Sequence, residues 1–125
     1  KTFGRFQFDG AWALVTRSTI PTLPLPLRLP TMKYFAATYT YGEPSLVDAT
    51  RPAHREFIAG QLALGRIVGS GPYVGAEQAL IILQLPDTAT EADAAAVLDG
   101  DPYTVAGALA AREIREWNPV MNIFS

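Results

Sequence analysis

The only histidine of this 125-residue chain, His54, is the side chain best suited to proton chemistry at neutral pH. Imidazole takes up and releases protons in that range, so a histidine held in place can act as a general acid or base. Helical spacing from His54 reaches four residues that would share one inward face, namely Phe57, Ile58, Gln61 and Leu62. The pattern therefore predicts an imidazole on the interior side of a helix.

The residues before His54 have the character of a helix start. Thr50 can act as an N-cap, and Pro52 then falls in the first turn, where a missing N–H costs nothing. We therefore predict a helix over residues 51–64, followed by Gly65 as its C-terminal left-handed residue. In that position His54 lies near the positive end of the helix dipole, which disfavours the imidazolium cation.

Other segments carry the patterns of strands and of a second helix. Aromatic and β-branched residues fill 33–41, as is typical of a strand. A nearly continuous apolar run within 77–85 is typical of a central strand buried on both faces. The remaining predicted elements are a strand at 66–70, a helix at 90–98 capped by Thr90, and a partly alternating strand at 107–117.

The predicted order is strand, helix, strand, strand, helix, strand, an α+β layout of the ferredoxin-like kind, βαββαβ. We expect one four-stranded antiparallel sheet with both helices on one face. The other face would be open and apolar, carrying Phe35 or Tyr34, Ile81 or Ile82, and Ile114. Because an exposed apolar face of this size usually marks an interface, we expect a homodimer packed sheet against sheet.

Composition narrows the class of protein further. An apolar fraction of 49% in 125 residues fits one domain with a hydrophobic core. The net charge of -2 and the scattered basic residues argue against a nucleic-acid partner. No apolar run approaches the roughly 20 residues that cross a bilayer, so no membrane partner is expected. Without cysteine and with a single histidine, we expect no metal site and no cofactor, and a protein of the reducing cytoplasm.

The first 31 residues differ in composition from the rest. Residues 20–30 contain four prolines with no helical or strand period, which favours an extended, polyproline-like backbone. Met32 then opens Met-Lys-Tyr-Phe in the manner of a natural translation start. We predict that residues 1–31 are an N-terminal extension, either non-native or a docking arm on a partner subunit, and that residues 32–125 form the domain.

Several short motifs follow one another along the chain: Met32-Lys33-Tyr34-Phe35, Arg51-Pro52-Ala53-His54, Gly65, Ser70-Gly71-Pro72, and Asp101-Pro102-Tyr103 followed by Gly107. Each motif is common by itself, whereas the set in this order and spacing is fairly specific. Over residues 32–124 the chain thereby resembles the YCII-related family, small proteins of the dimeric α+β barrel superfamily. The resemblance implies a ferredoxin-like domain that pairs into a dimeric α/β barrel.

The resemblance also implies a site. Family members carry a histidine and an aspartate that face one pocket, and the family includes a dehydrochlorinase that acts on a chlorinated, hydroxylated aromatic ring. The counterparts here are His54 and Asp101. In such a dyad the carboxylate fixes one ring tautomer and stabilises the imidazolium, so His54 would take a proton from a small organic substrate. The alternative is that this pair only ties the helix to the loop after the second helix.

Aromatic residues are further candidates for contact with a substrate. Tyr39 and Tyr41 share one side of the first strand, where their phenols could meet a substrate oxygen or simply pack as core aromatics. Tyr103 belongs to the same motif as Asp101. Asp101 itself could cap a short turn at Pro102, which is compatible with pairing to His54.

Two other segments could line the pocket. Arg51 could clamp an anion at the pocket mouth, or could be merely solvated at the helix start. In Ser70-Gly71-Pro72 the glycine would let backbone N–H groups approach a ligand closely, although a plain hairpin turn explains the same residues.

Three functional hypotheses follow. The first is a lyase or isomerase that uses the dyad, and the second is a non-catalytic ligand-binding or accessory dimer. The third is a purely structural pair. The substitution His54→Ala distinguishes the three hypotheses. An enzyme would lose rate but not its fold, and a structural pair would lose only stability. A binding module would bind its ligand without proton exchange.

Overall fold

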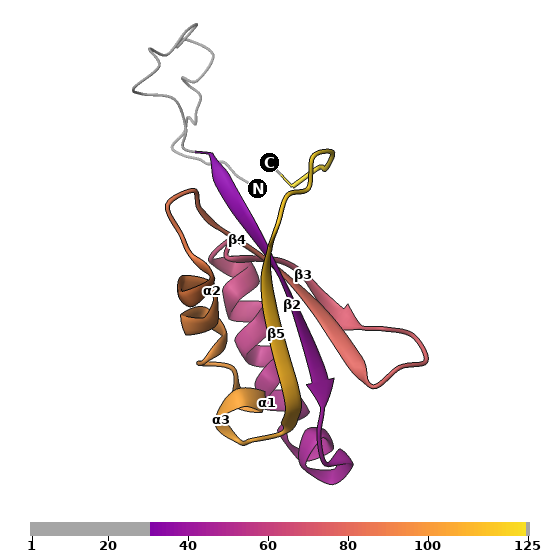
Figure 1. The fold of residues 1–125 in the computed structure, drawn as a ribbon. Helices are drawn as coiled ribbons and strands as arrows, with labels where there is room; N and C mark the ends of the chain where they lie inside the picture. The colour runs from indigo at the N-terminus through magenta and orange to yellow at the C-terminus, as the bar shows by residue number, and fades with distance from the viewer. Residues whose placement is uncertain (1–30, 125) are drawn as a thin grey trace, which may run out of the picture. The chain divides into compact units, whose positions relative to one another are not determined.

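The computed structural model describes residues 31–124 (Figure 1). The predictions made for the N-terminal extension up to Pro30 lie outside these residues. Seven elements follow in chain order: β2 (Met32–Tyr41), α1 (Pro44–Ala63), β3 (Ile67–Pro72), β4 (Gln78–Pro86), α2 (Glu91–Leu98), α3 (Pro102–Val105) and β5 (Leu109–Trp117).

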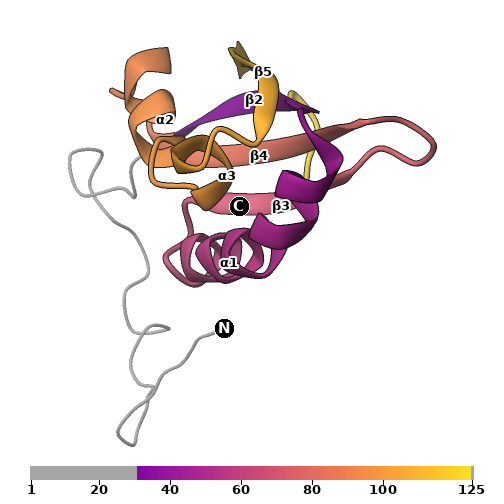
Figure 2. The same ribbon diagram turned by 90° about the horizontal axis from the view of Figure 1, so that it is seen from below.

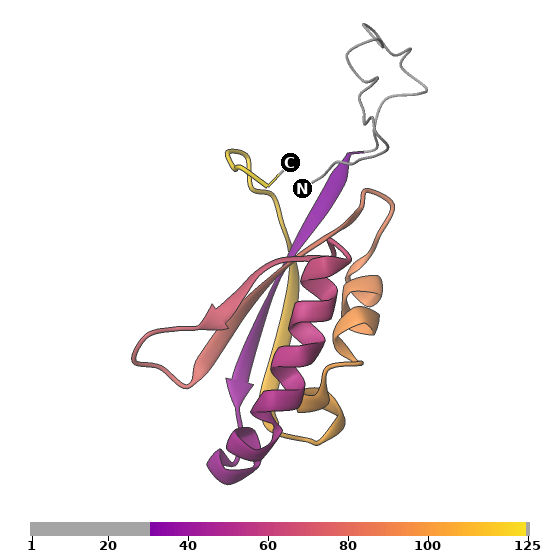
Figure 3. The ribbon, with the colours of Figure 1, turned by 180° about the vertical axis from the view of Figure 1, so that it is seen from behind.

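The strands form one antiparallel sheet in the order β3-β4-β2-β5. The helices lie on one face of this sheet (Figure 3), so the predicted α+β, ferredoxin-like architecture is confirmed. The short helix α3, which was expected only as a turn, is an addition to the two predicted helices. It packs against α1 immediately before β5 begins (Figure 2).

The hydrophobic core lies between the sheet and the helices. On β2 the residues that face the helices are Phe35, Ala37 and Tyr39, all fully buried. Strand β4 alternates buried and half-buried residues between its two exposed end residues, so the prediction of a strand buried on both faces was wrong for the single chain. Its continuous apolar run reflects two different surroundings, the core on one face and the open side of the sheet on the other.

Helix α1 starts well before the predicted position. It begins at Pro44 after the N-cap Glu43, whose side chain accepts the N–H of Leu46, and Thr50 lies inside the helix instead of capping it. Val47 is buried in the core, so packing holds these first turns in helical form despite Pro52, which lacks an N–H. Figure 3 shows the first turns set at an angle to the rest of the helix.

This shift removes the predicted effect of the helix dipole on His54. Dipole effects fall off within the first turn, and His54 lies far inside a 20-residue helix.

The other local predictions agree better with the structure. Thr90 and Asp93 form a capping box at the start of α2, and Gly65 has a φ of 77° immediately after α1. Asp101 caps α3 by accepting the N–H of Tyr103. The strand ends differ from the predicted ones by one or two residues, because the pairing between neighbouring strands stops at those positions.

The open face of the sheet is less apolar than predicted. Tyr34 and Ile82 do lie on it, whereas Phe35 and Ile81 face the helices. Ile114 was placed there wrongly, because it pairs with Ala37 and packs against the core. The positions of β5 that reach the open face carry Glu113 and Arg115 instead, while Phe124 covers the ring of Tyr34 at one end, with 5.4 Å between ring centroids.

Among the described residues, no helix is long and apolar enough to span a membrane.

Candidate functional site

Asp101 is the centre of the site, and its side chain is completely buried. It stands at the N-cap of α3, where Oδ1 accepts the backbone N–H of Tyr103 at 3.0 Å. Oδ2 accepts the hydroxyl of Tyr39 at 2.7 Å. Both partners donate hydrogen bonds, so they match a carboxylate that only accepts. Two elements far apart in sequence, β2 and α3, thereby fix the carboxylate in one orientation.

His54 completes this arrangement from α1. Its Nδ1 lies 2.8 Å from Oδ1 and 2.9 Å from Oδ2 of Asp101. Its ring stacks on that of Tyr103, with centroids 4.0 Å apart and planes 14° apart. Because a carboxylate accepts, we assign the ring proton of neutral His54 to Nδ1. The lone pair on Nε2, which has no hydrogen-bond partner within residues 31–124, is then free to take a proton.

Tyr39 supports the carboxylate from behind. Burial, followed by the charge of Asp101 and the hydrogen bond to it, raises the pKa of the Tyr39 phenol well above its ordinary value. The hydroxyl therefore keeps its proton at neutral pH and donates it to Asp101. Three side chains from three elements thus form the chain of hydrogen bonds Tyr39–Asp101–His54.

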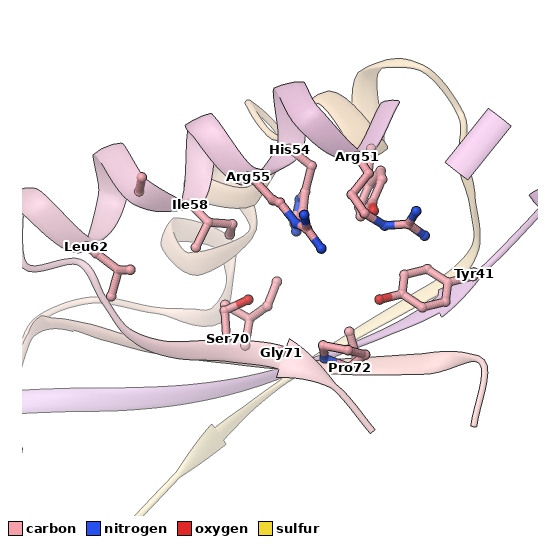
Figure 4. Close-up of a pocket in the computed structure, with 13 residues that line it drawn as sticks. Tyr41, Arg51, His54, Arg55, Ile58, Leu62, Ser70, Gly71 and Pro72 are labelled. Carbon is pink, nitrogen blue, oxygen red and sulfur yellow. The ribbon is translucent and has the colours of Figure 1, made fainter. Parts of the chain in front are cut away.

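His54 lines a cavity of about 240 Å³ between α1 and the strands β3 and β4. Figure 4 shows His54, Arg51 and Arg55 reaching from α1 toward β3, with the hydroxyl of Tyr41 pointing into the space between them. Cavities that hold drug-sized ligands measure about 300 to 1,000 Å³, so this one suits a smaller molecule.

The structure brings most of the predicted site residues to this cavity. The predicted residues that line it are Tyr41, Arg51, His54, Ser70, Gly71, Pro72 and Tyr103. Asp101 lies behind His54, out of contact with solvent. Tyr39 does not line the cavity, because its hydroxyl is bound to Asp101 and its side chain is completely buried.

Sequence reasoning missed several cavity residues: Arg55, Ile58, Ala59, Leu62, Ala79 and Ile81. Ile58 and Leu62 lie on the same helical stripe as His54, a spacing that was read only as core packing. Arg55 lies four residues after Arg51, so the two arginines share a helix face. That spacing could have indicated Arg55 as a second arginine at the cavity, although charged residues at a helix surface are usually only solvated.

No group of three or more histidine, cysteine, aspartate or glutamate side chains within residues 31–124 could hold a metal ion.

The fold and the site together describe a class of protein: a small α+β domain with a histidine–carboxylate pair beside a cavity. The sequence profile of the YCII-related domain matches residues 32–118, and the chain belongs to this family. A search of curated proteins found no match.

Solved structures similar to this chain include the following two. One is 5-chloro-2-hydroxyhydroquinone dehydrochlorinase (TftG) from Burkholderia phenoliruptrix AC1100, in complex with 2,5-dihydroxybenzoquinone. It is 21% identical with a TM-score of 0.56, and the match covers 68% of this chain and 93% of that one. The other is a nipsnap family protein of unknown function from Agrobacterium tumefaciens str. C58, 18% identical with a TM-score of 0.45, covering 75% and 97% of the two chains. At these identities the first similarity shows the shared fold.

Proposed function

We propose that this YCII-related domain is a small-molecule enzyme of the lyase or isomerase type, in which His54 takes a proton from a substrate carbon. The observation that carries the proposal is the geometry at His54. Its Nδ1 is held by both oxygens of a buried carboxylate, its Nε2 has no hydrogen-bond partner within residues 31–124, and the residue lines the cavity. A general base needs this arrangement, with one nitrogen oriented and the other free.

The proton transfer defines the class of reaction. Nε2 of His54 takes the proton, and the electron pair of the broken C–H bond forms a new double bond in the substrate. In an elimination, a leaving group such as chloride departs with its own electron pair. In an isomerisation, the pair moves into a neighbouring carbonyl, and a proton returns at another atom. Asp101 stabilises the imidazolium until His54 releases the proton to water or to the product.

The dehydrochlorinase named above performs one reaction of this class. Its low identity to this chain supports the fold only, so the reaction type rests on the geometry of His54 and Asp101. The buried hydrogen bond from Tyr39 adds support, since a carboxylate that only needed to cap α3 would require neither a phenol nor an imidazole.

The experiment is proton exchange in D₂O, followed by proton NMR. The substrates are a panel of hydroxylated and halogenated benzenes and cyclic diketones, together with chloride release from 5-chloro-2-hydroxyhydroquinone. We expect exchange or release above the buffer rate, and a loss of about 100-fold or more in His54→Gln. Glu56→Gln is the matched control, because Glu56 is an exposed neighbour on α1 that does not line the cavity.

The alternative is a non-catalytic ligand-binding or accessory dimer. It predicts that a panel member binds, with affinity reduced by substitutions in the cavity, while exchange in the wild type stays at the buffer rate. Unchanged exchange in His54→Gln, at full folding, would exclude His54 as the base.

We also infer that a second copy of the chain covers the open face of the sheet. The support is that Leu80 and Ile82 are only half-buried on this face in a single chain. The homodimer is part of the proposal and does not affect the assignment of His54.

A further inference from the structure

The charges around the cavity are unequally distributed. Two arginines, Arg51 and Arg55, line it together with His54, and all three side chains extend from α1 (Figure 4). Within the described residues, no aspartate or glutamate lines this cavity. The carboxylate of Asp101, which contacts His54, is completely buried behind the imidazole and already accepts three donors. The cavity is therefore a cationic recess in a chain whose net charge is -2.

The two arginines are not equivalent. Arg51 is paired with Asp48 one turn earlier on α1, with 2.9 Å between Nη1 and Oδ1. The guanidinium of Arg55 makes no ion pair and no hydrogen bond within residues 31–124. Guanidinium groups bind carboxylates and other oxyanions through two parallel hydrogen bonds. Arg55 is consequently the cation in the cavity that is ready to bind an anion.

A hydroxyl donor faces the same space. Burial, followed by the neighbouring Tyr103, raises the pKa of the Tyr41 phenol above its ordinary value, with Arg51 opposing the change. Tyr41 therefore keeps its proton at neutral pH and can donate it to a negatively charged oxygen. Figure 4 shows this hydroxyl pointing into the cavity.

Much of the remaining lining of the cavity is apolar. Ile58 and Leu62 of α1 and Ala79 and Ile81 of β4 contribute to it. Together with a volume of about 240 Å³, these side chains suit an unbranched or single-ring body. A molecule that matched this lining would carry a negative charge for the arginines and an apolar body.

We propose that the cavity takes a small organic anion, a carboxylate or phenolate on a single ring or a short apolar body, with Arg55 as its principal charge partner. The proposal deepens the proposed function and rests on this cavity being the substrate site. With the anion on Arg55, the apolar body lies between Ile58 and Ile81, beside the free nitrogen of His54. Arg55 then also stabilises the negative charge that develops when His54 removes a proton.

The test uses benzoate and benzamide, which have the same shape and differ in charge. Binding to the full chain is followed by NMR titration in the wild type, in Arg55→Met and in Arg66→Met. Arg66 is the matched control, because it is exposed and outside the cavity, and its replacement changes the net charge by the same amount. We expect benzoate to bind at least about tenfold more tightly than benzamide, and Arg55→Met to remove that difference. Arg66→Met should change benzoate affinity by less than about twofold.

Three results would overturn the proposal. The first is equal binding, or equal absence of binding, of benzoate and benzamide to the wild type. The second is an equal loss of benzoate affinity in Arg55→Met and Arg66→Met, which would mean that net charge alone attracts the anion. The third is an unchanged preference for benzoate in a folded Arg55→Met.

Failure of this proposal is distinguishable from failure of the proposed function. The ring C–H groups of benzoate are not acidic enough for His54 to remove a proton from them, so its binding does not depend on catalysis. Proton exchange lost in His54→Gln without any benzoate preference would support the enzyme and overturn the anion site. If the protein prefers benzoate but exchanges no proton on any panel member, the anion site is supported and His54 is not a catalytic base.

Discussion

Replacing Tyr39 with phenylalanine tests whether the buried phenol supports Asp101. The substitution removes one hydroxyl from a completely buried side chain and keeps the ring, so it deletes the 2.7 Å hydrogen bond to Oδ2 with little change in packing. A hydrogen bond to a charged group contributes about 1.5 to 3 kcal/mol. Without the hydroxyl, Oδ2 keeps only Nδ1 of His54 at 2.9 Å as a partner. We expect Tyr39→Phe to lose about 2 kcal/mol of unfolding free energy at pH 7.

The same substitution should change how stability depends on pH in alkaline solution. The pKa of Tyr39 is raised in the folded protein, whereas tyrosine in an unfolded chain ionises near pH 10. Above pH 10 the unfolded chain releases a proton that the folded protein retains. Tyr39 therefore contributes its full stability below pH 10, and that contribution falls by about 1.4 kcal/mol per pH unit as the pH rises toward the folded pKa.

Phenylalanine has no such proton, so the two proteins should converge at high pH. Starting from about 2 kcal/mol at pH 7, the advantage of the wild type should disappear between about pH 11 and 12. Urea denaturation followed by circular dichroism at several pH values between 7 and 11.5 measures this directly. Tyr73→Phe is the control for loss of a phenol hydroxyl at neutral pH, because the Tyr73 side chain is 46% exposed, and it should cost less than about 0.5 kcal/mol.

Two results would refute this reasoning. An unfolding free energy of Tyr39→Phe within about 0.5 kcal/mol of the wild type at pH 7 would mean that the phenol does not stabilise the carboxylate. A difference between the two proteins that stays constant from pH 9 to 11.5 would mean that the folded protein does not hold the Tyr39 proton.

Two further predictions concern the dyad and the open face. Asp101→Asn removes the carboxylate that selects the Nδ1–H form of His54. Nitrogen-15 NMR of the single histidine should then show the neutral ring moving toward the Nε2–H tautomer. An unchanged tautomer would mean that Asp101 does not fix the orientation of His54. Ile82→Glu should place a charge in the proposed dimer interface and weaken association by about 100-fold or more. Light scattering after gel filtration should then show the single-chain mass of 13.5 kDa for the variant at concentrations where the wild type has twice that mass, and a wild type that is itself monomeric would contradict the proposed dimer.

Much of the fold follows from local sequence patterns. Hydrophobic periodicity and turn residues predicted the four strands and two helices in their correct order. The capping box at Thr90 and the left-handed Gly65 were predicted because each depends only on residues a few positions away. The dimer, the cytoplasmic location and the nature of the N-terminal extension stay predictions.

The start of α1 could not be found in the same way. Local rules favour Thr50 and Pro52 as a helix start, but burial of Val47 extends the helix back to Pro44. Similarly, the alternation in β5 predicted one wet face, yet only its register with β2 decided that Ile114 faces the core. Both outcomes depend on packing between elements that are far apart in the chain.

The sequence by itself determined which groups are available for chemistry: one histidine, an Asp-Pro-Tyr motif, and a helix that turns His54 inward. Only the tertiary structure decided what surrounds them. It brought the Tyr39 hydroxyl to Asp101 across 62 positions of sequence, and it left Arg55 unpaired within residues 31–124 while Asp48 engages Arg51. Hydrogen bonds and ion pairs depend on separations of about 3 Å in space, which sequence spacing does not fix once the partners belong to different elements.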